Sequence, residues 1–407
     1  MLIVKKYGGS SVATPERVRN VASQIIEDVE KGYQIVVVLS AQGKTTDELV
    51  ARAYEMNPKP SRRELDMLLS TGEQQSVALM AMTLQAMGYQ AVSLNAFHVP
   101  MHTNKTYGSA RLEAIGTDRL QAELDCGNIV LVTGFQGVNR YEDITTLGRG
   151  GSDTTAVALA AALQADRCQI YTDVEGVYTA DPRYVKDARK LEEIGYDEML
   201  ELASTGAKVL HNRCVEMAKK YNVQIEVLSS MVKAPGTLVK EDSLVERMMV
   251  SGVAADKNVA RISVIGIPDL PGKAFALFNL LSQQGINVDI ILQSIGREDR
   301  KDISFTVAEE NAEEAYEIVK KHQQALGAEE VTCTKDVAKV SLVGAGMISN
   351  PGVATQMFEA LYSAQVNIRM ISTSEIKISV LVDKDQVEDA VRAVHHQFRL
   401  YKKESGR

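Results

Sequence analysis

Two glycine-rich turns constrain the fold of this chain more than any other feature of its sequence. The first runs from Lys6 to Ser11 (KYGGSS) and the second from Gly148 to Asp153 (GRGGSD). Each turn follows a strand-like apolar run and precedes a helical pattern. Glycines there allow bare backbone N–H groups to approach an anion, and the N-terminus of the following helix adds partial positive charge. Both turns are therefore predicted to bind phosphate groups.

The first turn lies between a short apolar strand at residues 2–4 and a helix. Thr14 as the N-cap and Pro15 at the first helical position mark the start of that helix. The glycine spacing is neither that of a P-loop nor the Rossmann G-x-G-x-x-G, and Lys6 precedes the glycines instead of following them. An ordinary tight turn with a solvated lysine is the alternative interpretation.

The second turn carries Arg149, which a purely structural turn does not need. A planar guanidinium binds a carboxylate or a phosphate through two parallel hydrogen bonds. An alanine-rich helix is predicted over residues 154–165, with Asp153 as its cap. The arginine therefore favours a binding function for this turn.

The composition is that of an ordinary soluble globular chain, because 45% of the 407 residues are hydrophobic and 24% are charged. This length predicts two or three domains. The 53 acidic residues exceed the 45 basic ones, and the net charge of −8 argues against nucleic acid or an anionic membrane as the partner. No signal peptide or membrane-spanning run is visible, so a cytoplasmic location is expected.

Cysteine and histidine spacings predict neither a disulfide framework nor a metal site. The four cysteines are scattered without a C-x-x-C pair. His98 and His102 have the i, i+4 spacing of a helical metal pair, but Pro100 between them breaks the helix that this spacing needs. We expect no dedicated metal-ligand set in the protein.

Strand and helix patterns alternate through the first half of the chain. Strands are predicted at 34–40, 91–94, 129–134 and 168–172, and one long helical pattern covers 61–87. This alternation predicts a mostly parallel sheet with helices on both faces, in which ligands bind at the carboxyl ends of the strands. We therefore expect the two glycine turns and residues 40–47 to meet in one crevice.

The pattern loosens at residues 231–242, which we interpret as the end of the first domain and the start of a linker. An internal repeat follows, since residues 260–266 have a counterpart at 338–344. Each copy reads as strand, helix, strand, strand, helix, which is a ferredoxin-like pattern. We expect the two copies to pack side by side, either as a ligand-binding pair or as oligomerisation modules.

Several motifs together resemble the aspartokinase family. They are the opening KYGGSS, the tripeptide at 71–73 (TGE), residues 134–137 (GFQG), the runs 145–162 and 171–183, and the paired repeats. The resemblance covers nearly the whole chain and is to the monofunctional bacterial type. It implies an α/β fold with an amino-acid-kinase-like αβα sandwich and mostly parallel sheet over 1–245. Two ferredoxin-like (βαββαβ) ACT domains would follow, over 246–335 and 336–407.

The resemblance implies transfer of the γ-phosphoryl group of Mg²⁺-ATP to the side-chain carboxylate of L-aspartate. The product would be 4-phospho-L-aspartate, the first step toward lysine, threonine and methionine. The accepting carboxylate has an ordinary pKa of about 4, so it is ionised near neutral pH and needs no general base. The remaining task is to position two anions and to spread the charge of a loose transition state.

The resemblance also assigns roles to individual residues. The implied catalytic residues are Lys6, Arg149 and Asp153. The implied nucleotide-binding residues are Lys6, Tyr7, Gly8, Gly9, Ser10, Tyr171, Thr172, Asp173, Tyr178, Asp181, Arg183 and Lys208. The implied aspartate-binding residues are Ser40, Thr46, Glu73, Arg149, Gly150, Gly151 and Ser152. Judged without the resemblance, Glu73 reads more simply as a solvated helix residue, and turn formation alone accounts equally well for Asp173 and Asp181.

The ACT domains imply feedback regulation by lysine, threonine or both. In the first copy the implied effector-binding residues are Asp269, Leu270, Pro271, Gly272, Lys273, Ala274, Asn287, Val288, Asp289 and Gln293. In the second copy they are Ala354, Thr355, Asn367, Ile368, Thr373 and Ser374. An effector acts only through unequal affinity for two conformations, which a sequence does not display.

The expected assembly is a homo-oligomer, or a pairing with a C-terminal fragment made from an internal start near Met248. Two other functions stay open, namely a kinase for a different amino acid such as glutamate or N-acetylglutamate, and a non-enzymatic amino-acid sensor. The chain departs from the family pattern at Gln42, Ser109 and Asn212, and residues 94–106 match poorly. The sequence therefore does not settle how the loop on the aspartate side is built or how tightly it binds aspartate.

Overall fold

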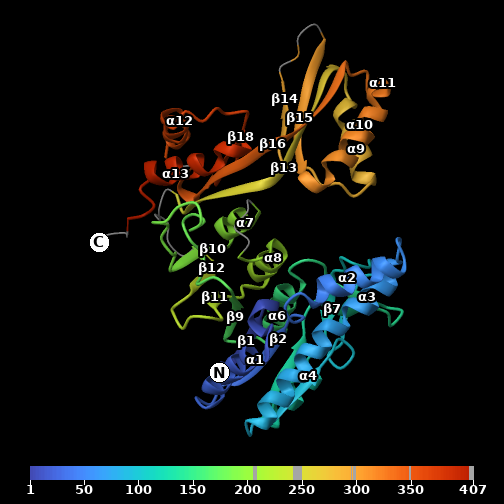
Figure 1. The fold of residues 1–407 in the computed structure, drawn as a ribbon, viewed down its shortest axis with the longest axis vertical. Helices are drawn as coiled ribbons and strands as arrows, with labels where there is room; N and C mark the ends of the chain where they lie inside the picture. The colour runs from blue at the N-terminus through green and yellow to red at the C-terminus, as the bar shows by residue number, and fades with distance from the viewer. Residues whose placement is uncertain (205–208, 242–249, 295, 297–298, 348–349, 403–407) are drawn as a thin grey trace. The chain divides into compact units, whose positions relative to one another are not determined.

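The computed structural model describes residues 1–204, 209–241, 250–294, 296, 299–347 and 350–402 (Figure 1). The described residues form two compact units. The first contains residues 1–177, 190–203 and 209–241, and the second contains 178–189, 204 and the described residues from 250 onward. Lys208 and Met248, both named from the sequence, lie outside the described residues. Each unit is considered by itself below.

An eight-stranded sheet forms the centre of the first unit. Its strand order is β10-β12-β11-β9-β1-β2-β6-β3, and every pair is parallel except β11 with β12. The strands are β1 (Leu2–Tyr7), β2 (Gln34–Leu39), β3 (Ala91–Leu94), β6 (Ile129–Thr133), β9 (Arg167–Thr172), β10 (Glu193–Gly195), β11 (Ile225–Ser229) and β12 (Thr237–Lys240). The mostly parallel sheet predicted from the alternating pattern is confirmed.

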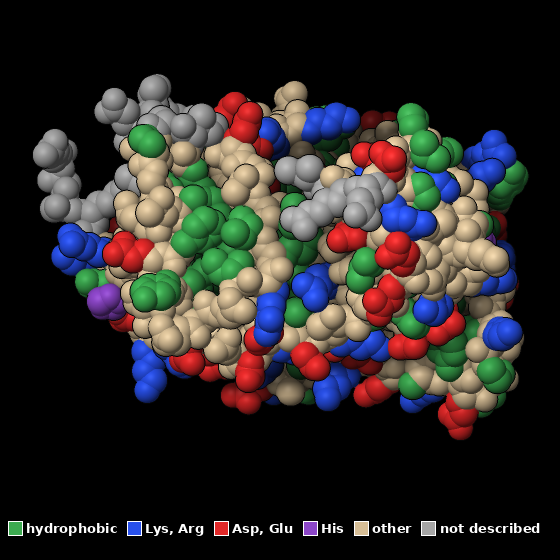
Figure 2. Space-filling view, turned by 90° about the horizontal axis from the view of Figure 1, so that it is seen from above, with side chains coloured by type: hydrophobic (Ala, Val, Ile, Leu, Met, Phe, Trp, Pro, Cys, Tyr) green, Lys and Arg blue, Asp and Glu red, His purple; other side chains and the backbone are tan. Residues whose placement is uncertain are grey.

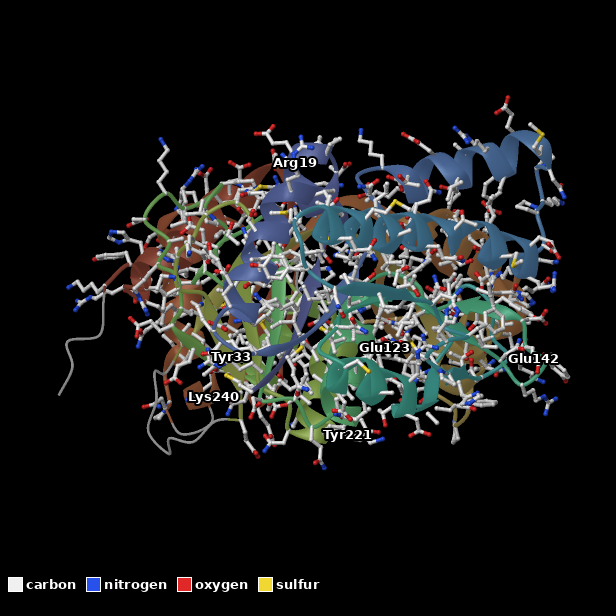
Figure 3. The ribbon with its side chains drawn as sticks, turned by 90° about the horizontal axis from the view of Figure 1, so that it is seen from below. Arg19, Tyr33, Glu123, Glu142, Tyr221 and Lys240 are labelled. Carbon is white, nitrogen blue, oxygen red and sulfur yellow. The ribbon has the colours of Figure 1, made fainter. Side chains whose placement is uncertain are left out.

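Helices cover both faces of this sheet. On one face, α1 (Pro15–Val29) and α4 (Thr71–Ala86) share an apolar core with β1, β2 and β6. On the other, α6 (Gly151–Ala162) packs against β1, β2 and β9, and α8 (Asn212–Tyr221) packs on α6. Figure 3 shows Arg19 of α1 and Tyr221 of α8 at opposite sides of the unit. The remaining helices are η1 (Gly9–Val12), α2 (Thr45–Met56), α3 (Arg62–Leu69), α5 (Asp118–Asp125) and α7 (Tyr196–Ser204).

A small four-stranded sheet, with strand order β5-β4-β7-β8, accompanies the large one. Its strands are β4 (Met101–Thr103), β5 (Leu112–Ile115), β7 (Gln136–Val138) and β8 (Ile144–Thr146). His102 therefore lies on a strand and not on a helix with His98, as the proline between them requires. The poorly matching residues 94–106 contribute β4 to this sheet.

Three expectations about local structure need correction. The linker expected at 231–242 contains β12, because the chain reverses direction over residues 230–236 and returns antiparallel beside β11. The helix expected over 61–87 is two helices that meet at Ser70, whose side chain donates to the Met67 carbonyl. Asp153 does not cap the helix that follows the second glycine turn, because that helix, α6, begins at Gly151 with Gly150 as its N-cap.

The cap of the first helix agrees with its prediction. The Thr14 side chain accepts a hydrogen bond from the Arg17 N–H, and Pro15 occupies the first position of α1. Such a cap satisfies one of the N–H groups that the first turn of a helix leaves without a partner.

The second unit is built on a six-stranded antiparallel sheet, with strand order β14-β15-β13-β16-β18-β17. Its strands are β13 (Gly252–Pro268), β14 (Ile291–Gln293), β15 (Arg300–Ala308), β16 (Glu330–Val343), β17 (Met370–Thr373) and β18 (Lys377–Asp383). Its helices are α9 (Lys273–Gln283), η2 (Glu309–Asn311), α10 (Ala312–Lys321), α11 (Gln323–Leu326), η3 (Ala345–Met347), α12 (Val353–Ser363), η4 (Lys384–Gln386) and α13 (Val387–Gln397).

The two repeats share their central strands. The first part of β13, residues 252–256, pairs with the second part of β16, and the rest of β13 pairs with the first part of β16. The second repeat therefore completes its sheet with a strand that precedes the first repeat in the chain. The expected boundary between residues 335 and 336 falls inside β16. The copies lie side by side in one continuous sheet, as the repeat pattern predicted.

Among the described residues, no helix combines the length and the apolar character needed to cross a bilayer.

The shared strands predict that the second repeat does not fold by itself. A fragment of residues 337–407 lacks the 252–256 strand, so the inner edge of β16 loses its hydrogen-bonding partner. We expect a cooperative thermal transition in circular dichroism for a fragment of residues 250–407 and none for the shorter fragment. A cooperative transition in the 337–407 fragment would contradict this assignment of strands.

Candidate active site

Strand β1 and helix α6 bring the two glycine turns together. Lys6, near the carboxyl end of β1, forms an ion pair with Asp153 in the first turn of α6, and Nζ lies 2.6 Å from Oδ1. The two side chains are only 11% and 12% exposed, so solvent and salt screen this pair weakly. A cation from one turn and an anion from the other are thus in direct contact at the carboxyl edge of the sheet.

Gly9 lets the first turn pack against the loop that follows β2. A Cβ atom at Gly9 would lie 2.5 Å from the Ala41 carbonyl oxygen, so a side chain there has no room. The Gly43 N–H donates to the Gly9 carbonyl at 3.0 Å, and the Gly8 N–H donates to the Tyr171 carbonyl at 3.4 Å. The N–H groups of residues 9 and 10, at the start of η1, have no partner within that helix and are available to an anion.

Gly150 gives the second turn its shape. Its φ of 67° lies in the left-handed region, and a Cβ atom there would lie 2.2 Å from the His211 Cβ. Gly134 lies equally close to Ser152, since an added Cβ would come within 2.5 Å of the serine Oγ. The first turn of α6 is thereby packed tightly between the end of β6 and the start of α8.

Arg149 is exposed, and within the described part of the chain no acidic side chain pairs with it. Its loop is nevertheless held firmly. Arg213 donates to the carbonyls of Leu147 and Ala110. The buried Asp66 carboxylate accepts hydrogen bonds from the Thr146 N–H and hydroxyl at 2.9 and 2.8 Å. A free guanidinium on a fixed loop is suited to bind an incoming carboxylate.

Glu73 lies in the first turn of α4 and is only 3% exposed. Its Oε1 accepts a hydrogen bond from the Ala41 N–H at 3.1 Å. Burial raises the pKa of this carboxyl to about 7, because desolvation penalises the charged form more than the backbone hydrogen bonds stabilise it. Glu73 is therefore not the solvated helix residue that its sequence position alone allowed.

Several buried polar atoms near this edge have no hydrogen-bond partner within the described chain. They are Glu73 Oε2, Thr133 Oγ1, Asp153 Oδ1 and His211 Nδ1. Asp153 Oδ1 contacts Lys6 as an ion pair without hydrogen-bond geometry. Burial also lowers the pKa of His211, which favours the neutral ring. Buried atoms of this kind cost free energy unless a partner is supplied, so their clustering indicates a polar ligand.

The remaining predicted residues of the first unit differ in burial and in position. Tyr7 is fully buried and stacks on Tyr171, with ring centroids 4.4 Å apart, so only its main chain can face a ligand. Ser40, at the end of β2, donates its N–H to the Tyr7 carbonyl, and Thr46 lies in the first turn of α2. Asp173 is exposed just beyond β9.

Three predicted nucleotide-binding residues belong to the second unit. Tyr178, Asp181 and Arg183 lie in the 178–189 segment, where the Arg183 guanidinium binds both oxygens of the Asp181 carboxylate. Their expected role, like that of Lys208, stays a prediction.

Sequence reasoning missed Thr133 and His211 as members of this cluster. Thr133 is the last residue of β6 and His211 is the N-cap of α8. A single threonine or histidine is an ambiguous signal. The available clue was position, since Thr133 directly precedes the GFQG motif.

Among the described residues, no group of three or more His, Cys, Asp or Glu side chains is placed to hold a metal ion.

The second repeat has a cavity of about 440 Å³ at the start of α12. Its lining includes Pro351, Gly352, Ala354, Thr373 and Ser374, of which the last three were predicted to bind an effector. Gly352, with a φ of 100°, caps α12 and leaves the first N–H groups of that helix for a ligand. Figure 2 shows hydrophobic side chains gathered on the left. In Figure 1 the same side of the second unit carries α12 and α13.

The other effector-site predictions are more dispersed. Ile368 lines a different cavity, beside Arg369 and Asp383. In the first repeat Asp269 pairs with Lys301 at 2.7 Å, and Asp289 pairs with the buried Lys339 of the second repeat. Gly272 caps α9 in the same left-handed conformation as its counterpart, with a φ of 90°.

Comparisons with known proteins agree with this architecture. Residues 1–229 match the amino acid kinase family, and residues 262–323 and 340–398 match the ACT domain. The chain is 51% identical to an aspartokinase of Geobacillus stearothermophilus over 98% of its own length and 97% of that protein.

The fold also resembles the crystal structure of Escherichia coli aspartokinase III in complex with aspartate and ADP. That match has a TM-score of 0.82 at 27% identity and covers 98% of this chain and 99% of that one. The complex of the same enzyme with lysine and aspartate gives a TM-score of 0.77, also at 27% identity, and covers the same shares of the two chains.

The packing around Gly150 predicts a large effect of adding one methyl group. Gly150→Ala meets both the strain of a left-handed alanine, about 1 kcal/mol, and the clash with His211. Gly32→Ala is the matched control, because Gly32 has a φ of 82° and no neighbour within 4 Å of an added Cβ. Denaturant unfolding should show a larger loss of stability for Gly150→Ala than for Gly32→Ala. Equal losses would mean that His211 does not confine this turn.

Proposed function

The chain belongs to the aspartokinase family and is an aspartate kinase, and from that premise we propose how its residues perform and regulate the reaction. The enzyme transfers the γ-phosphoryl group of ATP to the side-chain carboxylate of L-aspartate and forms 4-phospho-L-aspartate. This is the first step toward lysine, threonine and methionine, and it takes place in the cytoplasm. The observation that carries the proposal is the contact of Lys6 with Asp153 between the two glycine turns.

Lys6 stabilises the transferring phosphoryl group. Its ammonium lies beside the first glycine turn, where the N–H groups of Gly9 and Ser10 add partial positive charge. When the nucleotide binds, the Lys6 cation is shared between Asp153 and the phosphoryl oxygens. Charge held in place before the reaction lowers the barrier without reorganisation at the moment of transfer.

Aspartate is held at its two ends by groups of opposite charge. Arg149, whose guanidinium is exposed beside the second turn, binds a substrate carboxylate through two hydrogen bonds. The Oε2 atom of Glu73, buried and without a partner in the described chain, accepts the substrate ammonium. Ser40, Thr46 and the residues of the second turn through Ser152 line the space between them. This arrangement brings the reacting carboxylate to the phosphoryl group in a fixed orientation.

The nucleotide extends from the first turn along the end of β9. Tyr171, Thr172 and Asp173 are its contacts in the first unit, and the roles of Tyr178, Asp181, Arg183 and Lys208 stay predictions from the family resemblance. The complex of the Escherichia coli enzyme with ADP supports nucleotide binding by this fold.

Magnesium accompanies the ATP and is not held by a separate protein site. Mg²⁺ in kinases is bound by one or two carboxylates together with substrate phosphates and water. Asp153, whose Oδ1 has no hydrogen-bond partner in the described chain, is the carboxylate that fits this description. The ion would neutralise phosphate charge that the Lys6 ammonium does not reach.

The ACT repeats regulate the enzyme through lysine, threonine or both. The complex of aspartokinase III with lysine supports an amino-acid effector. The cavity beside Ala354, Thr373 and Ser374 is a binding place of suitable size. The predicted residues of the first repeat would bind a second effector molecule. The enzyme acts as a homo-oligomer, or pairs with its own C-terminal fragment made from an internal start near Met248.

An aspartate-dependent assay of ADP release, with hydroxylamine trapping of the acyl phosphate, tests the reaction. Lys6→Ala should lower kcat about 100-fold or more, because it removes a preorganised charge from the transition state. Lys31→Ala is the control, since that side chain is 57% exposed and its ion pair is worth little. Full activity in Lys6→Ala, or turnover with glutamate or N-acetylglutamate in place of aspartate, would overturn the proposal.

The raised pKa of Glu73 predicts pH-dependent aspartate binding. The ionised carboxylate accepts the substrate ammonium, so the KM for aspartate should fall as the pH rises through about 7. In Glu73→Gln the KM should be higher and should lose this dependence on pH.

The same group predicts an opposite effect on stability. A carboxyl with a raised pKa in the folded state stabilises the protein below the unfolded value of 4.5, and this stability is lost as the pH rises toward 7. Glu73→Gln should therefore raise the free energy of unfolding by about 2 kcal/mol at pH 8 and by much less at pH 5. Denaturant titrations at the two pH values measure the difference.

Filling the cavity at α12 should weaken feedback inhibition. Ala354→Phe places a ring in a space of about 440 Å³, so an effector that binds there needs a higher concentration to inhibit. Inhibition curves with lysine and threonine, added singly and together, identify the effector. Unchanged curves would place the effector elsewhere.

A further inference from the structure

Two buried serine hydroxyls connect the first glycine turn to the opposite side of the nucleotide site. Ser11, in η1, and Ser230, directly after β11, are 2% and 3% exposed. Their Oγ atoms are 2.7 Å apart, although 219 positions separate them in the chain. Neither residue was singled out from the sequence for this role.

The direction of these hydrogen bonds follows from the number of protons. Each hydroxyl carries one proton to donate. Ser11 donates to the Ser230 oxygen, and Ser230 donates to the Thr172 carbonyl at 3.2 Å. The chain of hydrogen bonds thus runs from the phosphate turn through Ser230 to the end of β9.

Ser230 is itself held from two sides. Its N–H donates to the same Thr172 carbonyl at 2.9 Å, and its carbonyl accepts from the Gln24 side-chain amide at 3.3 Å. Gln24 in turn accepts a long hydrogen bond of 3.5 Å from the Tyr7 hydroxyl. Ser230 is therefore a fixed point between α1, β9 and the glycine turn.

Beyond the pairing of Tyr7 with Tyr171, which ends the β1–β9 ladder, the main-chain contact between the turn and β9 is long. It is the hydrogen bond from the Gly8 N–H to the Tyr171 carbonyl, at 3.4 Å. The 2.7 Å contact of the two hydroxyls is the shorter connection, and through Ser230 it reaches Thr172, which the proposed function assigns to the nucleotide.

Resting on the proposed function, we infer that Ser230 is a positioning residue for the nucleotide. Where the β1–β9 ladder ends, its hydroxyl holds the turn that binds the phosphates to the strand end that binds the nucleoside part. Ser230 does not touch the substrate. It acts through Ser11 and Thr172, so its loss should affect MgATP more than aspartate.

The direction of the hydrogen bonds predicts unequal effects of the two alanine variants. Ser230→Ala leaves the buried Ser11 hydroxyl without its acceptor, whereas in Ser11→Ala the Ser230 hydroxyl still donates to Thr172. Ser230→Ala should raise the KM for MgATP and the Kd for MgADP by about tenfold, and Ser11→Ala by about threefold. The double variant should be no worse than Ser230→Ala, because both changes break the same connection.

The control is a second pair of buried serines. Ser341 and Ser379 in the second unit also have Oγ atoms 2.7 Å apart and are 0% and 1% exposed. Ser379→Ala removes a hydroxyl from a matching environment outside the nucleotide site. It should change thermal stability to a similar extent as Ser230→Ala and leave both KM values of the uninhibited enzyme within about twofold.

The experiment combines calorimetric titration of MgADP without aspartate, steady-state kinetics and thermal unfolding on the full chain. A raised Kd for MgADP and KM for MgATP in Ser230→Ala, with an unchanged KM for aspartate and partial recovery in Ser230→Thr, supports the inference. Unchanged nucleotide binding with lowered stability, or equal rises in both KM values, overturns it. If the wild type binds MgADP but does not phosphorylate aspartate, the proposed reaction fails while the titration still decides the role of Ser230.

Discussion

The ion pair between Lys6 and Asp153 depends on the alternation of side chains along β1. Successive residues of a strand point to opposite faces, so Lys6 reaches α6 while its neighbour Tyr7 is buried on the side of α1. A shift of one residue in the pairing of β1 would turn the cation toward α1 and the tyrosine toward α6. The parallel pairing of β1 with β2 and β9 therefore determines which charge faces the second glycine turn.

Much of the first unit could be predicted because its signals are local. The apolar runs that became β2, β3, β6 and β9 have strand length, and Thr14 with Pro15 marks the start of α1 within a few residues. The glycine turns were recognisable since glycine is required where backbones approach closely, as Gly9 does to Ala41. The candidate site inherited its position from these elements through the rule that parallel strands end at one edge.

Other features depend on contacts that are distant in the sequence. Strand β12 looked like a linker because Pro235 and Gly236 resemble a domain boundary, and only pairing with β11 and β10 shows it as part of the sheet. His211 joined the site because the start of α8 packs against Gly150, a contact that no local pattern encodes. The burial that raises the pKa of Glu73 likewise arises from tertiary packing, while its helix alone would leave it in water.

The two strands that the repeats share couple them mechanically. Because β13 and β16 each run through both halves of one sheet, neither half can twist or slide without moving the hydrogen bonds of the other. The irregular pairing of β13 with β16 between Asp256 and Arg261 is the place where such a motion would be absorbed or passed on. A small molecule that binds one half therefore acts on a sheet that both repeats share. An insertion in β13 or β16 would likewise have to fit the strand pairing of both repeats.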